Sequence, residues 1–299
     1  MWKVSIPASS GNIGVGFDCA GLAIALYNAI DFEERESGLI IEQSVPSPYI
    51  PCNEKNMIFQ AAKYAADKLG KKLPGLYLKQ YNGIPHTRGM GSSAACSVGG
   101  ILIADTVLGA GLSKDEILEI ATELEGHPDN AAPAIFGGAC VSAKYSGKIL
   151  TRPIPIQEDL ALCLAIPSFT LSTKKARGVL PSQIPVKDAI TNISGMGLLI
   201  SAFYSGDYSA LRIALNDRLH QPYRKSLIAH FDDVIQAFYN CGAYGACLSG
   251  AGPTILAFVD KADAQLAARV AQKTKNFSGN WNIVSSDFDR RGAFVEKLS

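Results

Sequence analysis

Small residues and hydroxyl groups gather in the segment RGMGSSAA, Arg88 to Ala95, directly before a long run with almost no charge. The run predicts a helix that is buried on every side and begins at Ser92 or Ser93. The N-terminus of a helix offers unpaired N–H groups and the positive end of the helix dipole. Glycine lets a ligand approach the backbone closely. The segment therefore predicts an anion site, and phosphate is the anion that we expect there.

The same segment has two alternative interpretations. A glycine pair followed by serine also suits a tight turn with a serine N-cap. Gly89, Gly91 and Ala94 meet the dinucleotide pattern GxGxxG/A, which would indicate an NAD-binding oxidoreductase. That pattern needs an acidic residue about 20 positions further on at a strand end, whereas Glu116 and Glu119 lie in a predicted helix. The Walker A pattern is absent from the chain.

The composition of the chain favours a small-molecule enzyme. The 299 residues are 47% apolar and 18% charged, with a formal net charge of +1, which gives no electrostatic reason to expect nucleic acid. We expect neither a membrane helix nor a signal peptide, because the apolar runs are short and Pro7 interrupts the first one. The seven cysteines include no CxxC pair and the four histidines no HExxH motif. We therefore expect reduced thiols, a cytoplasmic protein and no zinc site.

The elements that would position this loop follow from periodicity and capping signals. Strands are expected at residues 2–8, 25–37, 39–45, 76–82, 160–167, 246–250, 254–259 and 292–298. Besides the apolar helix, helices are expected at residues 56–70, 113–126, 187–204, 207–216 and 261–274. A polar segment with two prolines predicts a domain boundary near residue 155. Since the elements lack a regular βαβ order, the sequence favours two α+β domains.

Three segments together identify a family. PHTRGMGSSAA, Pro85 to Ala95, resembles the nucleotide loop of the GHMP kinases, which phosphorylate small metabolites that carry a hydroxyl group. PASSGNIGVGFD, Pro7 to Asp18, and CLSGAGPT, Cys247 to Thr254, are similar to the N-terminal and C-terminal motifs of that family. The resemblance implies an N-terminal domain, residues 1–155, like the second domain of ribosomal protein S5. It implies a ferredoxin-like C-terminal domain, residues 156–299, and ATP with Mg²⁺ as the phosphoryl donor.

Three further segments narrow the resemblance to one branch. ELEGHPDNAAPAIFGG, STKKARGVLP and NDRLHQPYR are similar to the GHMP kinases that act on homoserine. The chain departs from the usual motifs at Ser9–Ser10–Gly11, at Met90 and at His86–Thr87, without losing a polar group to which we assign a role. The resemblance implies transfer of phosphate from ATP to the hydroxyl of L-homoserine, a step of threonine biosynthesis.

The resemblance also assigns the nucleotide and the metal to particular residues. Ser93 and Glu125 resemble the family's Mg²⁺ ligands, in accord with the preference of Mg²⁺ for hard oxygen atoms. An N-cap at Ser93 and a solvated carboxylate at Glu125 are the alternatives, although a carboxylate suits a helix C-terminus poorly. Asn56 either reaches the adenine or caps its helix. The expected nucleotide contacts are Asn56, Pro85, His86, Thr87, Arg88, Gly89, Met90, Gly91, Ser92, Ser93, Ala94 and Ala95.

A site for homoserine needs an anion for its ammonium group and cations for its carboxylate. Asp18 suits the ammonium group, and the guanidinium groups of Arg177 and Arg224 suit the carboxylate. The resemblance adds Asn12 and His127 as substrate contacts and Thr173 near the transferred phosphate. We expect catalytic roles for Asn130, Thr173 and Arg177, with Asp129 as the alternative to Asn130 for the position that faces the hydroxyl.

Other functions stay open at this point. A GHMP kinase for mevalonate, shikimate or a sugar would leave Asp18 and the two arginines unexplained, because those acceptors carry no ammonium group. A non-catalytic relative would have no need of Ser93 and Glu125. The sequence does not report the oligomeric state, and it leaves a homodimer open.

Overall fold

A seven-stranded sheet forms the first half of the protein in the computed structural model, which describes residues 1–298. Its path runs in the order β11-β1-β2-β4-β3, and β5 and β6 join through β2. β2 has 20 residues and pairs along its length with β1, β4 and β5, so it is the central strand of this sheet. The strands are β1 (Trp2–Asn12), β2 (Gly16–Arg35), β3 (Leu39–Gln43), β4 (Gly75–Asn82), β5 (Ala139–Tyr145), β6 (Lys148–Ile154) and β11 (Phe294–Lys297).

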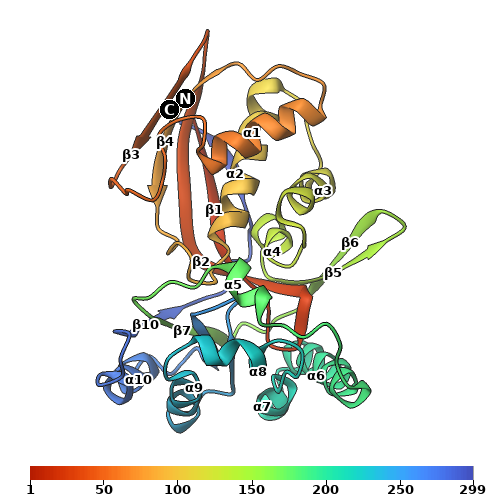
Figure 1. The fold of residues 1–299 in the computed structure, drawn as a ribbon, viewed down its shortest axis with the longest axis vertical. Helices are drawn as coiled ribbons and strands as arrows, with labels where there is room; N and C mark the ends of the chain where they lie inside the picture. Colours follow the sequence, from red (N-terminus) through yellow and green to blue (C-terminus); the bar gives the residue numbers. More distant parts are fainter. Residues whose placement is uncertain (299) are drawn as a thin grey trace.

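Four helices cover one face of this sheet (Figure 1). They are α1 (Met57–Lys68), α2 (Ser92–Leu108), α3 (Lys114–Glu125) and α4 (Ala131–Phe136). α2 contacts β1, α1, α3 and α4, which explains why its sequence is apolar on all sides. α3 begins with the predicted capping box, since the side chain of Ser113 accepts from the N–H of Glu116 and that of Glu116 from the N–H of Ser113.

The second half of the protein is ferredoxin-like. Its four-stranded sheet has the order β10-β7-β9-β8, with all neighbours antiparallel. The helices lie mainly at the end of the molecule opposite α1 (Figure 1). The elements are β7 (Leu160–Ile166), α5 (Thr173–Gly178), α6 (Val186–Ser205), η1 (Tyr208–Ala210), α7 (Leu211–Ala214), α8 (Gln221–Arg224), η2 (Lys225–Leu227), α9 (Phe231–Asn240), β8 (Gly245–Leu248), β9 (Ile255–Asp260), α10 (Leu266–Thr274) and β10 (Asn282–Ser286).

The α+β class predicted from the sequence is confirmed, with differences in detail. The strands β5, β6 and β10 and the helices α4, α5, α8 and α9 were not expected, and α10 begins at Leu266 rather than at residue 261. β11 pairs with β1, with Trp2 opposite Lys297, so the end of the chain returns to the first sheet. The division at residues 155 and 156 stays a prediction that does not account for this strand. Within residues 1–298, no helix has both the length and the apolar character that a membrane span requires.

Candidate active site

A cavity of about 1220 Å³ lies between the two halves and is lined by residues of all three glycine-containing segments. Backbone bonds hold these segments together. Ser9 N donates to Met90 O (3.2 Å) and Gly250 N to Gly11 O (3.1 Å). The hydroxyl of Ser249 donates to Gly89 O (2.6 Å). The cavity wall is therefore built where the first motif, the loop and the C-terminal motif meet.

The glycines of the loop are required by protein packing. Gly89 and Gly91 have φ angles of +72° and +66°, a region that side chains rarely adopt. A Cβ on Gly91 would stand 2.0 Å from Ser9 Oγ, and a Cβ on Gly89 would stand 2.3 Å from Ser249 O. The sequence argument attributed the small residues to close approach of a ligand. The structure gives a second cause, since these two positions touch the other two motifs.

The N-terminus of α2 is open to the cavity. Its N-cap is Gly91, which offers no side chain to cap the helix. The first helical bond is Ala95 N to Gly91 O, so the N–H groups of Ser92, Ser93 and Ala94 have no helical acceptor. All three residues line the cavity. The serine N-cap, which the sequence left as an alternative, does not occur, and the geometry suits an anion.

Arg88 and His86 hold the loop in place. Arg88 donates to three carbonyl groups, those of His86 (2.9 Å), Pro167 (2.9 Å) and Ser168 (2.6 Å), and so ties the loop to the segment after β7. His86 Nδ1 lies 3.0 Å from the hydroxyl of Ser92. Burial and the charge of Arg88 lower the pKa of His86, which favours the neutral ring. Arg88 was expected to bind the nucleotide, and its three nitrogen atoms already have partners.

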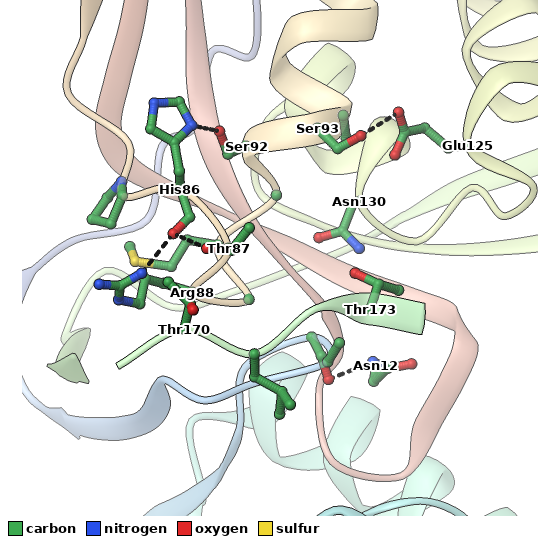
Figure 2. A pocket seen from close by; sticks show the side chains of 18 of the residues that line it. Asn12, His86, Thr87, Arg88, Ser92, Ser93, Glu125, Asn130, Thr170 and Thr173 are labelled. Atoms are coloured by element: carbon green, nitrogen blue, oxygen red, sulfur yellow. Dashed lines mark hydrogen bonds between the residues drawn. The ribbon is translucent and has the colours of Figure 1, made fainter. Parts of the chain in front are cut away.

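Glu125 forms a cluster of oxygen atoms with two serines of α2. Its Oε1 accepts from Ser93 Oγ (2.9 Å) and from Ser97 Oγ (2.6 Å). Figure 2 shows Ser93 and Glu125 facing each other at the start of α2. Glu125 Oε2 accepts from neither serine. Hydroxyl and carboxylate oxygens are ligands that Mg²⁺ accepts, so these residues fit a Mg²⁺ ion beside a bound triphosphate.

Asp18 and Arg177 form a two-point ion pair across 159 positions of sequence. Arg177 Nη2 donates to Asp18 Oδ1 (2.7 Å) and Nη1 to Oδ2 (3.0 Å). This bonding raises the pKa of Arg177, which stays charged. Both side chains line the cavity and are about one-third exposed, at 33% and 38%. The pair thus presents an anion and a cation side by side, which is the charge pattern of an amino acid zwitterion.

Arg224 is a buried cation without a carboxylate partner. Only 1% of its surface is exposed, and no ion pair joins it to an acid among residues 1–298. Burial and the nearby charge of Arg177 lower its pKa to about 10. The ring of Phe17 lies under both guanidinium groups, 5.4 Å from the Cζ of Arg224 and 5.8 Å from that of Arg177. Asp18, Asp217 and Asp129 act on this charge from a distance, and a buried cation without a direct ion pair in a cavity wall is suited to bind an anion.

Asn130 lines the cavity, and Asp129 lies behind it. Asn130 Oδ1 accepts from Ser9 Oγ and from Gly11 N, each at 3.1 Å. Asp129 is 1% exposed, and its carboxylate bonds to the ring of His127, which raises the pKa of that ring. Figure 2 shows Asn130 and Thr173 projecting toward one another in the cavity. The preference for Asn130 over Asp129 as the group that faces the cavity agrees with this arrangement.

Most of the predicted site residues meet in this cavity, and three do not. Asp129, Ala95 and Asn56 are absent from its lining. Asn56 is 2% exposed and caps α1, since its Oδ1 accepts from Ile58 N (3.0 Å) and from Gln80 Nε2. The capping alternative accounts for these contacts of Asn56.

Sequence reasoning missed several residues of the lining. Tyr49, Met57 and Leu124 expose apolar surface there, and no pattern in the sequence around them indicates this. Ser97 lies one helical turn after Ser93, so its contact with Glu125 could have been found from helical spacing. Gly250 was predicted only as part of the C-terminal motif, without a role of its own, and its carbonyl accepts from Asn12 Nδ2 (2.8 Å) and from Arg224.

Comparisons with known proteins identify the family of the chain. Residues 56–138 match the GHMP kinases N terminal domain, and residues 199–276 match the GHMP kinases C terminal family. The homoserine kinase of Clostridium botulinum strain Eklund 17B is 45% identical over 298 residues, which cover 99% of each chain. The crystal structure of homoserine kinase from Cytophaga hutchinsonii has a TM-score of 0.86 at 26% identity, over 98% of this chain and 96% of that one.

A structure of another activity is similar as well. L. major mevalonate kinase, solved in complex with R-mevalonate, has a TM-score of 0.74 at 18% identity, over 97% of this chain and 96% of that one. A likeness at this identity concerns the fold alone. The fold therefore does not separate the possible acceptors, and the residues of the cavity must do so.

Proposed function

The chain belongs to the homoserine kinases of the GHMP kinase superfamily, and from this we propose that it transfers the terminal phosphoryl group of ATP to the hydroxyl of L-homoserine. The product is O-phospho-L-homoserine, an intermediate of threonine biosynthesis. The observation that carries the choice of acceptor is that one cavity holds Asp18, Arg177 and Arg224, of which Arg224 is buried and forms no ion pair among residues 1–298. Mevalonate, shikimate and sugars carry no ammonium group, so none of them would form an ion pair with Asp18.

The nucleotide is assigned to the side of the cavity formed by α2 and its loop. The free N–H groups of Ser92, Ser93 and Ala94 would cradle phosphate oxygens in a helix N-terminus. The exposed apolar surfaces of Tyr49, Met57 and Leu124 would contact the adenine ring. A volume of about 1220 Å³ exceeds what a ligand of drug size needs, which supports simultaneous binding of nucleotide and acceptor.

The metal is assigned to Ser93 and Glu125. Bound Mg²⁺ would neutralise charge on the phosphate oxygens as the phosphoryl group leaves. Ser97 holds Glu125 Oε1 through its hydroxyl, which fixes the carboxylate toward the start of α2. The fit of Mg²⁺ is supported by this set of hard oxygen atoms.

Homoserine is assigned to the opposite side, between the first motif and α5. Its ammonium group would pair with Asp18, and its carboxylate with Arg177 and Arg224. Binding of a zwitterion would exchange the ion pair of Asp18 and Arg177 for two pairs with the substrate, so no charge would be left uncompensated. Asn12 would hold the site together rather than bind the substrate, because its Nδ2 donates to Gly250 O and its Oδ1 accepts from Asp18 N.

The acceptor hydroxyl is assigned to the space beside Asn130 and Thr173. Of the acidic side chains among residues 1–298, only Asp18 and Glu125 line this cavity, and each already accepts hydrogen bonds. Asn130 cannot take a proton, and Asp129 is buried against His127. We therefore propose that the chain supplies alignment and charge, and that the proton passes to a phosphate oxygen. A loose transition state permits this order, because proton removal is not needed early.

Assembly and location complete the proposal. We assign the protein to the cytoplasm, in accord with seven cysteines that are all free thiols. A homodimer is supported by an apolar stripe on α6, where Val186, Ile190 and Ile193 are 76%, 57% and 73% exposed. Light scattering at micromolar concentration tests the dimer, and a monomer mass would overturn it.

The experiment that tests the activity is identification of the product. The purified protein, ATP, Mg²⁺ and L-homoserine are incubated, and the mixture is followed by ³¹P NMR. We expect a phosphomonoester resonance that grows with ADP and co-migrates with O-phosphohomoserine. ADP formed without a phosphorylated amino acid would overturn the proposal.

A further inference from the structure

Arg224 keeps one nitrogen atom free for a ligand. A guanidinium group has five N–H donors in fixed directions. Nε donates to Ala176 O (3.2 Å), and Nη1 donates to Gly250 O (3.1 Å) and lies 3.3 Å from His220 Nδ1. No hydrogen bond within residues 1–298 uses Nη2. Three donors therefore hold the group in place, and the two of Nη2 remain available in the cavity wall.

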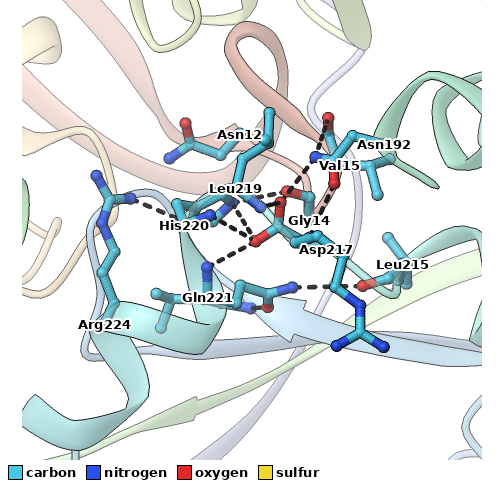
Figure 3. Close-up of polar contacts among 12 residues, drawn as sticks. Asn12, Gly14, Val15, Asn192, Leu215, Asp217, Leu219, His220, Gln221 and Arg224 are labelled. Carbon is cyan, nitrogen blue, oxygen red and sulfur yellow. Dashed lines mark hydrogen bonds and ion pairs between the residues drawn. The ribbon is translucent and has the colours of Figure 1, made fainter. Parts of the chain in front are cut away.

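His220 supplies the side-chain acceptor among these three contacts. Its ring is fully buried, and Nε2 lies 2.7 Å from Gly14 O. A carbonyl oxygen can only accept, so the hydrogen of the neutral ring is on Nε2 and the lone pair is on Nδ1. That lone pair faces Arg224 Nη1 (Figure 3). The ring also stacks on Phe17, with centroids 5.4 Å apart.

The surroundings of His220 fix both its position and its charge. Asp217 accepts from the N–H groups of Leu219, His220 and Gln221 and from Asn192 Nδ2, which holds the turn before α8 (Figure 3). Its Oδ2 lies 3.6 Å from His220 Nε2. Burial and the charge of Arg224 lower the pKa of His220, against the opposing charges of Asp217 and Asp18. The neutral ring is the form that can accept from a guanidinium group.

We propose that His220 is a positioning residue for the carboxylate of the substrate. Its neutral ring, anchored on Gly14 O, accepts from Arg224 Nη1 and so directs the free Nη2 toward the cavity. This inference rests on the proposed function, since it takes the bound anion to be the homoserine carboxylate. His220 has no place in the lining of the cavity and acts only through Arg224.

Two substitutions of His220 test the roles of Nδ1 and Nε2 separately. His220→Asn retains an acceptor near the position of Nδ1 and loses the anchor, whereas His220→Gln retains a donor near the position of Nε2 and loses the acceptor. The loss of a hydrogen bond to a charged group predicts that His220→Gln raises the KM for homoserine about tenfold. We expect His220→Asn to stay within about threefold of wild type. The KM for ATP should be unchanged in both, and kcat should change less than the KM for homoserine.

Two further readouts distinguish positioning from a structural role. With 3-aminopropanol, which has no carboxylate, His220→Gln should have no effect on KM. In a double-mutant cycle, adding His220→Gln to Arg224→Leu should cause no further loss, because the ring acts through that arginine. His230→Asn, a change at a histidine outside the cavity, is the matched control and should leave every constant unchanged.

The outcomes separate this inference from the proposed function. If the wild-type protein does not phosphorylate homoserine, the proposed function fails. If the wild-type protein does phosphorylate homoserine, two results would refute the positioning role alone. One is a wild-type KM for homoserine in His220→Gln, and the other is a full additional loss when His220→Gln is added to Arg224→Leu. If His220→Gln does not fold, His220→Leu, which also lacks the acceptor, replaces it in both readouts and in the cycle with Arg224→Leu, and equal loss of kcat/KM on homoserine and 3-aminopropanol would refute the role.

Discussion

Replacement of Arg224 by leucine probes the recognition of the substrate carboxylate. The side chain is 1% exposed and forms no ion pair with an acid among residues 1–298, so in the proposed complex the substrate carboxylate would be its direct ion-pair partner. Loss of one partner of a buried, hydrogen-bonded charge pair costs about 2–5 kcal/mol. Since about 1.4 kcal/mol is tenfold, kcat/KM for homoserine should fall roughly 30- to 4,000-fold.

The assay compares three alcohols that differ in their charged groups. Steady-state ADP release is measured with homoserine, with 4-hydroxybutyrate, which lacks the ammonium group, and with 3-aminopropanol, which lacks the carboxylate. Arg224→Leu should lower kcat/KM strongly for homoserine and 4-hydroxybutyrate, which carry a carboxylate, and little for 3-aminopropanol. Arg152→Leu, at an exposed arginine of β6, is the control and should leave all three unchanged.

An equal loss of kcat/KM with all three alcohols in a folded variant would refute the reasoning. Folding must be checked by thermal unfolding, because the substitution leaves the carbonyl group of Ala176 without the donor Nε, while Gly250 O keeps its bond from Asn12 Nδ2. A buried carbonyl group without a partner costs about 1–3 kcal/mol of stability, while removal of a buried cation stabilises the fold. Normal nucleotide-dependent stabilisation of the variant would show that the first motif and the loop are intact.

Three other predictions follow from the same geometry. Glu125→Gln should lower kcat by about 10²-fold or more while changing the KM for homoserine little, because a bound metal stabilises charge that grows in the transition state; unchanged kcat at saturating Mg²⁺ would make Glu125 a helix-end residue. Gly91→Val should lower the midpoint of thermal unfolding as well as nucleotide binding, because its Cβ would meet Ser9 Oγ at 2.0 Å; an unchanged midpoint would contradict the packing argument. The bond to Asp129 raises the pKa of His127 in the folded state. The protonated ring therefore stabilises the fold fully below the ordinary pKa of histidine, and this contribution is lost as pH rises through the raised pKa. Urea unfolding should therefore show a larger deficit for His127→Gln at pH 6 than at pH 9, and a deficit independent of pH would refute the pairing.

The Gly91 substitution shows where reasoning from the sequence was incomplete. On the sequence alone, the small residue at this position is explained by the close approach of a ligand. The sequence could not reveal that Ser9, 82 positions away, occupies the space beside Gly91. The helix after the loop was predictable, because an apolar run without a polar face is a local property of the sequence.

Contacts between distant residues limited the prediction of the site. Asp18, Arg177 and Arg224 could be proposed from charge and from the family resemblance. Their different states, one tight pair and one unpaired buried cation, depend on how α5 and α8 pack beside the first motif. Likewise, nothing local in residues 294–297 indicates that they pair with β1. Capping signals were more reliable, since Ser113, Gly126 and Asn56 act within a few residues of themselves.

The central claim is that charge recognition in this cavity selects homoserine as the acceptor. Its most direct test is kcat/KM of the wild-type protein, measured by coupled ADP release with homoserine, mevalonate, shikimate and galactose under one condition. The account predicts that homoserine exceeds each of the others by at least about 10²-fold, the ratio that one unmatched charged group produces at about 2.7 kcal/mol. An equal or higher value with any acceptor that lacks an ammonium group would contradict it.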